Sequence, residues 1–395
     1  MNTIKQIIAV TALNLRNISQ RLASSAVAVV GVGAVVLVFA AVLSMAAGLE
    51  RTMLSAGSDD TAIILRNGST SELNSGLSNE QTLIVSNAPG VLKDGNAPIV
   101  SSELYVVVDV KKRSNQSDAN VPFRGVQASA FDVRQNVTIS DGRMFEEGKN
   151  EIVVGRSAQQ EFMGLETGKT IRFGQNEWVV VGTFDANGSV SESELWTDVR
   201  VLQGAYRRGN SFQSVRVKLE SPESIEILEQ ALAEDPRIDA DVLTEREYYS
   251  SQSQGLVQFI KLIGYPLTFL MAIGAVFGAL NSMYSSVSVR GKEIATLRAL
   301  GFGPTAVLVS TVVESVMLAL AGGVLGGLLA YLVFNGFQVS TLNGPSFSQV
   351  VFDFAVTPEL LGQGMRAALL IGVVGGLFPA IRAARLPVAT ALREL

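Results

Sequence analysis

Residues 164–170 read Gly-Leu-Glu-Thr-Gly-Lys-Thr and form the stretch most similar to a nucleotide-binding loop. A phosphate-binding loop has four residues between its glycines, so that backbone N–H groups surround the phosphates, and it opens a helix. Here three residues separate Gly164 from Gly168, and the residues that follow are typical of a strand. We therefore expect a turn that enters a strand, and no nucleotide site.

The composition limits the other catalytic chemistries. The 395 residues include no histidine and no cysteine, which removes Ser-His-Asp triads, thiol nucleophiles and the usual zinc ligands. A Ser-Lys pair remains compatible with the composition, but no lysine stands near a nucleophile-elbow pattern. The sequence predicts a protein that is not an enzyme and that holds no cofactor and no metal.

Long uncharged segments dominate the chain. They cover residues 22–49, 262–289, 315–334 and 360–381, the last interrupted only by Arg366. Because a bilayer core is crossed by about 20 apolar residues of helix, we predict four spanning helices. The first exceeds the apolar core of about 7–15 residues of a signal peptide, so we interpret it as a retained anchor.

Basic residues predict the orientation of these helices. They are Lys5, Arg16 and Arg21 near the N-terminus, Arg290, Lys292 and Arg298 in the second connection, and Arg382, Arg385 and Arg393 near the C-terminus. The 336–358 connection contains no lysine or arginine. Since basic residues collect on the cytoplasmic side, both termini and the 290–303 segment are expected there, and residues 50–255 outside.

The predicted fold is a membrane α-helical protein with a large α+β domain inserted between the first and second spanning helices. Its predicted parts are a cytoplasmic amphipathic helix at 1–21, spans at 22–49, 256–289, 304–335 and 359–381, an external domain at 50–255, a cytoplasmic helix at 290–303, a short external loop at 336–358 and a cytoplasmic tail at 382–395.

The external segment holds 31 acidic and 20 basic residues, a net charge of −11, which argues against a nucleic acid partner. Runs rich in valine, isoleucine and aromatic residues predict strands at 62–65, 104–110, 123–127, 151–154, 170–173, 178–181 and 214–219. Helices are predicted at 79–86, 156–163 and 222–234, and two subdomains are expected, the second inserted in the first.

The residues before the first span have helical periodicity. An apolar face contains Ile4, Ile7, Ile8, Thr11, Ala12 and Leu15. Two interpretations are open: a helix lying in the membrane interface, or a cytoplasmic continuation of the first span.

Small residues recur every four positions in the later spans. The pairs are Gly274 and Gly278, Gly322 and Gly326, Gly323 and Gly327, and Gly372 and Gly376. This spacing lets helices approach closely in lipid. It is compatible with packing inside the chain and with a dimer interface, and the pattern does not separate the two.

Glu314 is the one acid among the apolar residues of the third span. An intramembrane acid is a candidate functional group. The favoured alternative places Glu314 at the cytoplasmic boundary, near Arg290 and Arg298.

Residues 290–302, RGKEIATLRALGF, predict a short helix that Gly301 ends and that Gly303-Pro304 keeps from continuing. Ile294 and Leu297 lie on an apolar face, with the charged residues off it. Such a helix either docks on a cytoplasmic protein or binds lipid headgroups.

This helix and the Glu-Ser-x-x-Leu-x-Leu-x-Gly-Gly-x-x-Gly-Gly pattern of 314–327 resemble the permease domain shared by FtsX, LolC/LolE and MacB. The motifs Glu-Ile-Val-Val-Gly at 151–155, Leu-Glu-Thr-Gly at 165–168 and Trp-Val-Val-Val-Gly at 178–182 are similar to the MacB-like periplasmic core domain. The chain is thereby identified as an ABC transporter permease of the MacB/FtsX/LolC-LolE type.

The resemblance implies a homodimer, or a dimer with a related permease, in a bacterial inner membrane, and two separate ABC ATPase subunits. ATP-driven closure of the ATPases would move the periplasmic domains by mechanotransmission. The implied coupling-helix residues are Arg290, Lys292, Glu293, Ile294, Leu297, Arg298 and Gly301. A periplasmic adaptor and membrane lipid are further expected partners. The implied function is efflux or export; FtsX-like signalling to a cell-wall enzyme and LolC/LolE-like lipoprotein release are alternatives.

Overall fold

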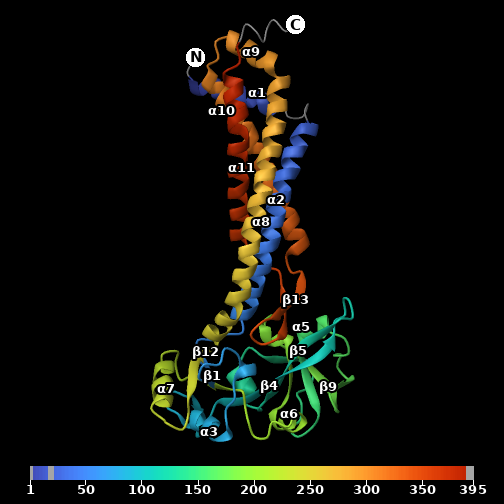
Figure 1. Ribbon diagram of the computed structural model, residues 1–395, viewed down its shortest axis with the longest axis vertical. Coiled ribbons are helices and arrows are strands. Elements are labelled where there is room, and N and C mark those ends of the chain that lie inside the picture. The colour runs from blue at the N-terminus through green and yellow to red at the C-terminus, as the bar shows by residue number, and fades with distance from the viewer. Residues whose placement is uncertain (1–2, 17–21, 388–395) are drawn as a thin grey trace. The chain divides into compact units, whose positions relative to one another are not determined.

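The computed structural model describes residues 3–16 and 22–387 (Figure 1). The chain divides into two compact units. We call the first the helical unit (Met1–Ala47, Phe259–Phe337 and Phe354–Leu395) and the second the α/β unit (Gly48–Gln258 and Gln338–Asp353).

Four helices in the described part of the chain are long and apolar enough to cross a membrane. They are α2 (Leu22–Leu54), α8 (Glu245–Val289), α10 (Pro304–Phe334) and α11 (Pro358–Ala384). The α/β unit is built mainly from residues between α2 and α8. The predicted fold class, four apolar helices with an α+β domain after the first, is confirmed.

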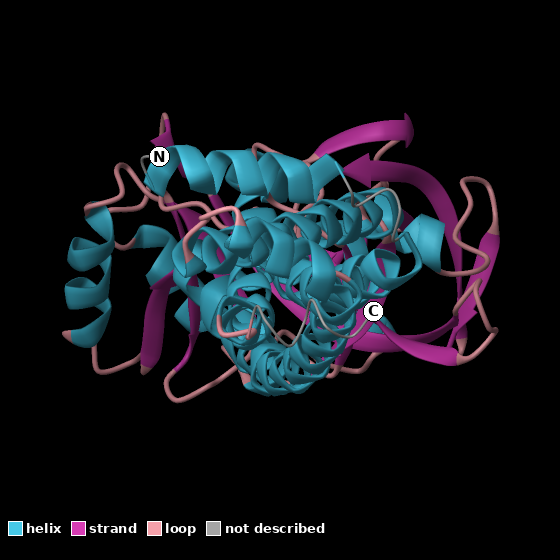
Figure 2. Ribbon diagram, turned by 90° about the horizontal axis from the view of Figure 1, so that it is seen from above, coloured by secondary structure: helices cyan, strands magenta, loops and turns pink. Residues whose placement is uncertain are grey.

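A shorter helix, α1 (Thr3–Arg16), lies across the ends of the spans and does not extend α2 along its axis (Figure 2). Val10 and Asn14 are buried, whereas Ile4 and Ile8 are exposed. The Gln6 side-chain oxygen accepts a hydrogen bond from the Gly303 N–H at 3.1 Å. The exposed isoleucines therefore form an apolar face that suits a membrane interface.

Glycines bring α10 close to its neighbours within the helical unit. A Cβ added to Gly326 would lie 2.2 Å from the carbonyl oxygen of Gly33 in α2. A Cβ on Gly376 of α11 would lie 2.5 Å from the Cβ of Ser315 in α10. Only a hydrogen fits at these positions, because the facing atoms belong to backbone or to packed helices.

The α/β unit is a ten-stranded sheet with helices around it. Its strands are β1 (Thr61–Arg66), β4 (Val100–Lys111), β5 (Asp118–Val126), β6 (Thr138–Gly142), β7 (Glu151–Gly155), β8 (Thr170–Phe173), β9 (Asn176–Asp185), β10 (Leu195–Asp198), β11 (Ser214–Lys218) and β12 (Ala240–Thr244). The order is β12-β1-β11-β4-β5-β10-β7-β9-β6, with β8 beside β9. A separate small hairpin pairs β2 (Lys93–Asp94) with β3 (Ala97–Pro98).

The helices of this unit are α3 (Asn79–Asn87), α4 (Ala130–Val133), α5 (Arg156–Glu161), α6 (Val199–Ala205) and α7 (Ser224–Ala233), with 3-10 turns η2 (Glu72–Asn74) and η3 (Val190–Ser193). The helix predicted at 222–234 begins two residues later, at Ser224, with Glu223 as its N-cap.

The sheet has two halves that meet along β4. Residues 100–103 of β4 pair with β11, and residues 104–111 pair with β5. The chain leaves the first half through β4 and returns to it in β11, so the second half is an insertion in the first. Each half packs its own hydrophobic core, one under β1, β11 and α7 and one around β4, β5, β7 and β9.

The segment predicted as a short loop at 336–358 contains a hairpin instead, formed by β13 (Gln338–Asn343) and β14 (Ser348–Asp353). It packs on the α/β unit. The Val351 N–H donates to Ser193 Oγ at 2.9 Å, and Lys112 Nζ donates to Ser340 Oγ at 2.7 Å. The alternation of β-branched and polar residues in 338–342 is typical of a strand and could have indicated this hairpin.

We expect Gly326→Ala to lower the stability of the helical unit by about 1–3 kcal/mol, because the added methyl group overlaps the Gly33 carbonyl. Gly362→Ala, in α11, is the matched control, since nothing lies within 4 Å of a Cβ there. Thermal unfolding of the two purified variants in detergent measures the difference. Equal midpoints would contradict the close contact of α2 with α10.

Candidate functional site

The helix predicted in the second connection is α9 (Gly291–Ala299). Gly301 follows it with a φ of +92°, a conformation that favours glycine, and its N–H donates to the Arg298 carbonyl at 3.1 Å. Gly303 is then the N-cap of α10, with Pro304 in the first turn. The end of α9 therefore agrees with the helix-ending glycines predicted from the sequence.

The seven candidate coupling residues divide into inward and outward groups. Ile294 is buried in a core with Val287, Val307 and Ala383. Lys292 and Glu293 are exposed, and Leu297 and Arg298 are partly buried. Leu300, which the coupling set omitted, is 73% exposed.

Arg290 points into the helical unit and pairs with Glu314 of α10. Its Nη1 lies 2.6 Å from Glu314 Oε2, and both side chains are 5% exposed. Arg290 and Ile294 are therefore buried side chains that position α9 against α10 and α11. The sequence had placed Glu314 near Arg290, and the structure shows the pair.

Arg298 fastens the far end of α9. Its Nη1 donates to the carbonyl oxygens of Ala384 and Leu386, each at 2.9 Å, at the end of α11. Cations near a helix C-terminus satisfy carbonyls that have no partner in the helix. α9 is thus tied to α10 at its start and to α11 at its end, with Lys292, Glu293, Thr296 and Leu300 facing outward.

The glycines singled out in α10 and α11 make contacts inside the helical unit. Besides Gly326 and Gly376, added Cβ atoms would meet Val29 and Val32 at Gly322, Ala368 and Met365 at Gly323, Leu361 at Gly327, and Ala319 at Gly372. The pair Gly274 and Gly278 faces open space on α8.

The glycines at 164 and 168 have positive φ and stand in a turn before β8, so this segment enters a strand as the sequence predicted.

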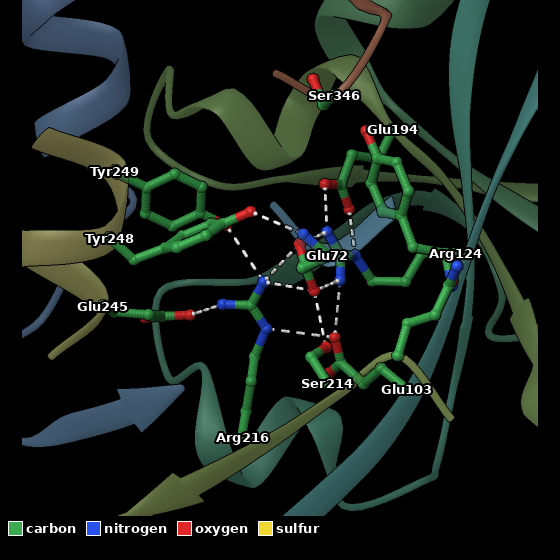
Figure 3. A network of polar contacts seen from close by, with 12 residues as sticks. Glu72, Glu103, Arg124, Glu194, Ser214, Arg216, Glu245, Tyr248, Tyr249 and Ser346 are labelled. Carbon is green, nitrogen blue, oxygen red and sulfur yellow. Dashed lines mark hydrogen bonds and ion pairs between the residues drawn. The ribbon is translucent and has the colours of Figure 1, made fainter. Parts of the chain in front are cut away.

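A second cluster, in the α/β unit, was not foreseen from the sequence. Four carboxylates and three guanidinium groups lie together with at most 5% exposure each: Glu72, Glu103, Glu194, Glu245, Arg124, Arg134 and Arg216. Figure 3 labels all of them except Arg134. We call these seven residues the charge cluster. They come from η2, β4, β5, β11, the first residue of α8, and the residues after α4 and η3.

Arg124 is the centre of one half of the cluster. Its two terminal nitrogens donate to Glu72 at 2.6 and 2.9 Å, and its Nε and Nη2 donate to Glu194 at 2.7 Å each. Two bidentate pairs on one guanidinium fix its plane, and Nη1 also donates to Glu103 at 2.9 Å, so all five N–H donors have partners. The indole N–H of Trp196 also donates to Glu194, at 2.6 Å.

Arg216 connects α8 to the sheet. Its Nη1 donates to Glu245 Oε1 at 2.5 Å, its Nε to Glu103 at 3.1 Å, and its Nη2 to the Tyr249 hydroxyl at 3.3 Å. Arg134 completes the set with a bidentate pair to Glu103, both bonds 2.7 Å long. The cluster therefore joins both halves of the sheet to the first turns of α8.

Electrostatics in the cluster favour charged carboxylates. Burial alone would raise the pKa of Glu72, but Arg124 and Arg216 outweigh it and lower that pKa to about 2. The pKa of Glu103 is likewise lowered, against burial, by Arg134, Arg216 and Arg124. Among the residues that the structure describes, no group of acidic side chains is arranged to hold a metal ion. The carboxylates of the cluster form ion pairs with its arginines.

Arg216→Met should destabilise the α/β unit by about 3–5 kcal/mol, because it leaves buried carboxylates without their partner. The double variant Arg216→Met/Glu245→Leu should recover a large part of that loss, since an apolar pair of similar size replaces the ion pair. Arg246→Met is the control, because Arg246 pairs with Asp59 at the surface. Chemical denaturation of the three proteins tests this, and equal losses for Arg216→Met and Arg246→Met would contradict it.

Stability should also depend on pH through Glu72. A carboxylate whose pKa is lower in the folded protein stabilises the fold above its unfolded pKa, here near the ordinary value of 4.5. This contribution should be lost as the pH falls from about 4.5 towards 2. Unfolding midpoints measured across that range should fall, and Glu72→Gln should flatten the slope. An unchanged slope in Glu72→Gln would be evidence against a charged Glu72.

Comparisons with known proteins agree with this architecture. The model of the MacB-like periplasmic core domain matches residues 25–235, and that of the FtsX-like permease C-terminal domain matches residues 267–388. The chain is 25% identical over 307 residues to the macrolide export ATP-binding/permease protein MacB of Pasteurella multocida, covering 73% of this chain and 45% of that protein. It is 24% identical over 374 residues to MacB of Neisseria gonorrhoeae, covering 85% and 56%.

Solved structures that are similar include the extracellular domain of the noncanonic ABC-type transporter YknZ from Gram-positive bacteria, with TM-score 0.35, 16% identity, and coverage of 47% of this chain and 100% of that one. The periplasmic region of MacB from Actinobacillus actinomycetemcomitans has TM-score 0.38, 16% identity, and coverage of 51% and 95%. The chain spans about half the length of the curated relatives it matches. It belongs to the family of ABC transporter permeases that combine a MacB-like periplasmic core domain with an FtsX-like permease domain.

Proposed function

We propose that this chain is the permease subunit of an ABC-type exporter in a bacterial inner membrane, and that it couples ATP hydrolysis by a separate cytoplasmic ATPase to movement of its α/β unit. The observation that carries the proposal is α9, a short helix fastened at both ends, with Lys292 and Leu300 exposed on its outward face. Family membership supplies the partner: the similar MacB proteins are named ATP-binding/permease proteins.

The outward face of α9 combines charge with one large apolar side chain. Lys292 and Glu293 are exposed, and Leu300 stands beside them at the end of the helix. An exposed leucine within a charged rim is the composition of a protein contact. Because Arg290–Glu314 and Arg298 hold α9 to α10 and α11, a force on this face would reach both spans and not only the connection.

Movement would reach the α/β unit through the chain itself. α8 is continuous over 45 residues, and its first residue, Glu245, is a member of the charge cluster. Its last residue, Val289, directly precedes Arg290. We propose that this connection carries ATP-driven rearrangement to the α/β unit, which would handle the substrate on the periplasmic side.

The proposal also includes the orientation of the chain, a second permease subunit and a periplasmic adaptor. The basic residues of the termini and of 290–303 favour a cytoplasmic position for α9 and for both ends of the chain. A second permease subunit would supply a second α9 for a second ATPase, and the open glycine face of α8 at 274–278 is a candidate for that contact. A periplasmic adaptor would join an exporter of this kind.

Substitution on the outward face of α9 tests the ATPase contact. We expect Lys292→Glu/Leu300→Asp to reduce the ATPase that co-purifies from native membranes by about tenfold or more, because charge and apolar contact are both lost. Leu83→Asp, on the exposed face of α3, is the matched control. Mass spectrometry and ATP hydrolysis of the purified complexes measure the effect.

Ile294 is unsuitable for that test, since an acid there would disrupt the core around Val307. The proposal fails if no ABC ATPase accompanies the unmodified protein, or if the α9 variant retains as much ATPase as Leu83→Asp.

A further inference from the structure

Three arginines on α6 and the turn after it are exposed and have no partner. The side chains of Arg200, Arg207 and Arg208 make no hydrogen bond, ion pair or ring contact with any residue that the structure describes. Several other exposed arginines of the α/β unit pair with carboxylates, as Arg113 does with Glu166 at 2.6 Å, and Arg66 and Arg172 donate to backbone carbonyls. In a domain with 31 acidic residues, this local excess of unpaired positive charge calls for an explanation.

The turn holds these arginines in a fixed arrangement. Arg207 has a φ of +55°, which is costly for a residue other than glycine, and Gly209 follows with a φ of +59°. The buried Gln203 donates to the Ser211 carbonyl at 2.9 Å, and Ser211 Oγ donates to the Arg208 carbonyl at 2.7 Å. The strain is thus sustained by a hydrogen-bonded turn, in which Arg207 and Arg208 are exposed.

We call α6 and the turn after it, with Arg200, Arg207 and Arg208, the arginine ridge. Two hollows border this ridge, and both are lined by Arg200, Gly204 and Arg207. One has a volume of about 610 Å³ and the other about 750 Å³. Neither is lined by an acidic residue. Amide side chains line them instead: Asn79, Gln127, Asn210, Asn150, Gln175 and Asn176.

We propose that this surface binds an acidic segment of a separate protein. The planar guanidinium groups of Arg200, Arg207 and Arg208 would take carboxylates in bidentate pairs. Asparagine and glutamine side chains both donate and accept hydrogen bonds, which suits the N–H and C=O groups of a peptide backbone.

A lipid surface fits less well. It offers phosphate acceptors only, and a protein that enters it uses exposed apolar side chains. Within residues 199–212, which the structure describes throughout, no large apolar side chain is exposed. Residues 50–255 carry a net charge of −11, so the rest of their surface repels acidic polypeptides and confines binding to the arginine ridge. Binding should weaken as salt is added, because salt screens the attraction between the arginines and the carboxylates.

Binding of a defined acidic polymer to the full-length protein tests the surface. The protein is placed in nanodiscs of zwitterionic phosphatidylcholine, and fluorescent poly-L-glutamate is titrated by anisotropy. Arg200→Gln/Arg207→Gln/Arg208→Gln should weaken binding by about tenfold or more. Lys93→Gln/Lys111→Gln/Lys169→Gln removes the same charge from exposed lysines of the α/β unit and should leave binding within about twofold.

Several outcomes overturn the proposal. They are no binding by the unmodified protein, an equal loss in both triple variants, and arginine-dependent binding that occurs only with anionic phosphatidylglycerol vesicles. Unfolding midpoints of the arginine variant should match those of the unmodified protein, since these exposed side chains make no hydrogen bond or ion pair with described residues, so lost binding reports on the surface itself.

A photo-crosslinker in cells identifies the natural segment. Gly204 is replaced by p-benzoylphenylalanine, for which the surrounding space is open. The cross-linked peptide should be rich in aspartate and glutamate and should disappear in the arginine triple variant. A peptide without acidic residues, or one that persists in that variant, overturns the proposal. The experiment needs no ATPase, so its result is independent of the proposed coupling through α9.

Discussion

The mutual satisfaction of seven buried charges is the constraint on which the α/β unit depends. Arg124 and Arg216 reach carboxylates from η2, β4, the residues before β10 and α8, and each of these carboxylates lies beyond the reach of water. A buried carboxylate without its guanidinium costs several kcal/mol, so no one of these elements can shift without breaking a pair. The hydrophobic cores of the two sheet halves tolerate small displacements, whereas bidentate pairs do not. The cluster therefore fixes how the halves and the first turns of α8 meet.

The same device recurs at the other end of α8. Arg290 follows the last residue of that helix and pairs with Glu314 at 2.6 Å, with both side chains buried. Each end of α8 is thus held by a buried ion pair whose partner lies far away in the sequence. Such pairs add little net stability compared with apolar packing. They strongly disfavour alternative positions of the helix, because displacing one partner leaves the other as a buried, unpaired charge. At α8, such pairs specify the position of both ends of the helix relative to the residues that they contact.

The features predicted correctly from the sequence are those whose signals are local. The four apolar helices follow from uninterrupted hydropathy, and β8 or β11 from short β-branched runs between turn residues. The charge cluster has no local signal. Glu72, Glu103 and Glu194 read as ordinary surface acids, and each is buried with arginines at least 21 residues away in the sequence, as Glu103 is with Arg124. The burial of Arg290 and Ile294 has no local signal either, because the sequence shows an apolar stripe and charges on α9 but not which side of α9 faces its neighbouring helices.

The hairpin β13–β14 changes how the two units are connected. Its strands belong to the α/β unit, while the residues on either side belong to the helical unit, so the chain passes between the units four times: before Gly48, after Gln258, before Gln338 and after Asp353. All four candidate spans are therefore joined covalently to the α/β unit. Lys112, Ser193 and Tyr105 hold the hairpin there through hydrogen bonds to Ser340, Val351 and Ser348. Under the proposed coupling, a rearrangement that begins at α9, between α8 and α10, would have one path through α8 and a second path through α10 and the hairpin. Two connections to one unit would convert a relative displacement of α8 and α10 into a change within the unit, whereas a single connection would transmit it only as movement of the whole unit.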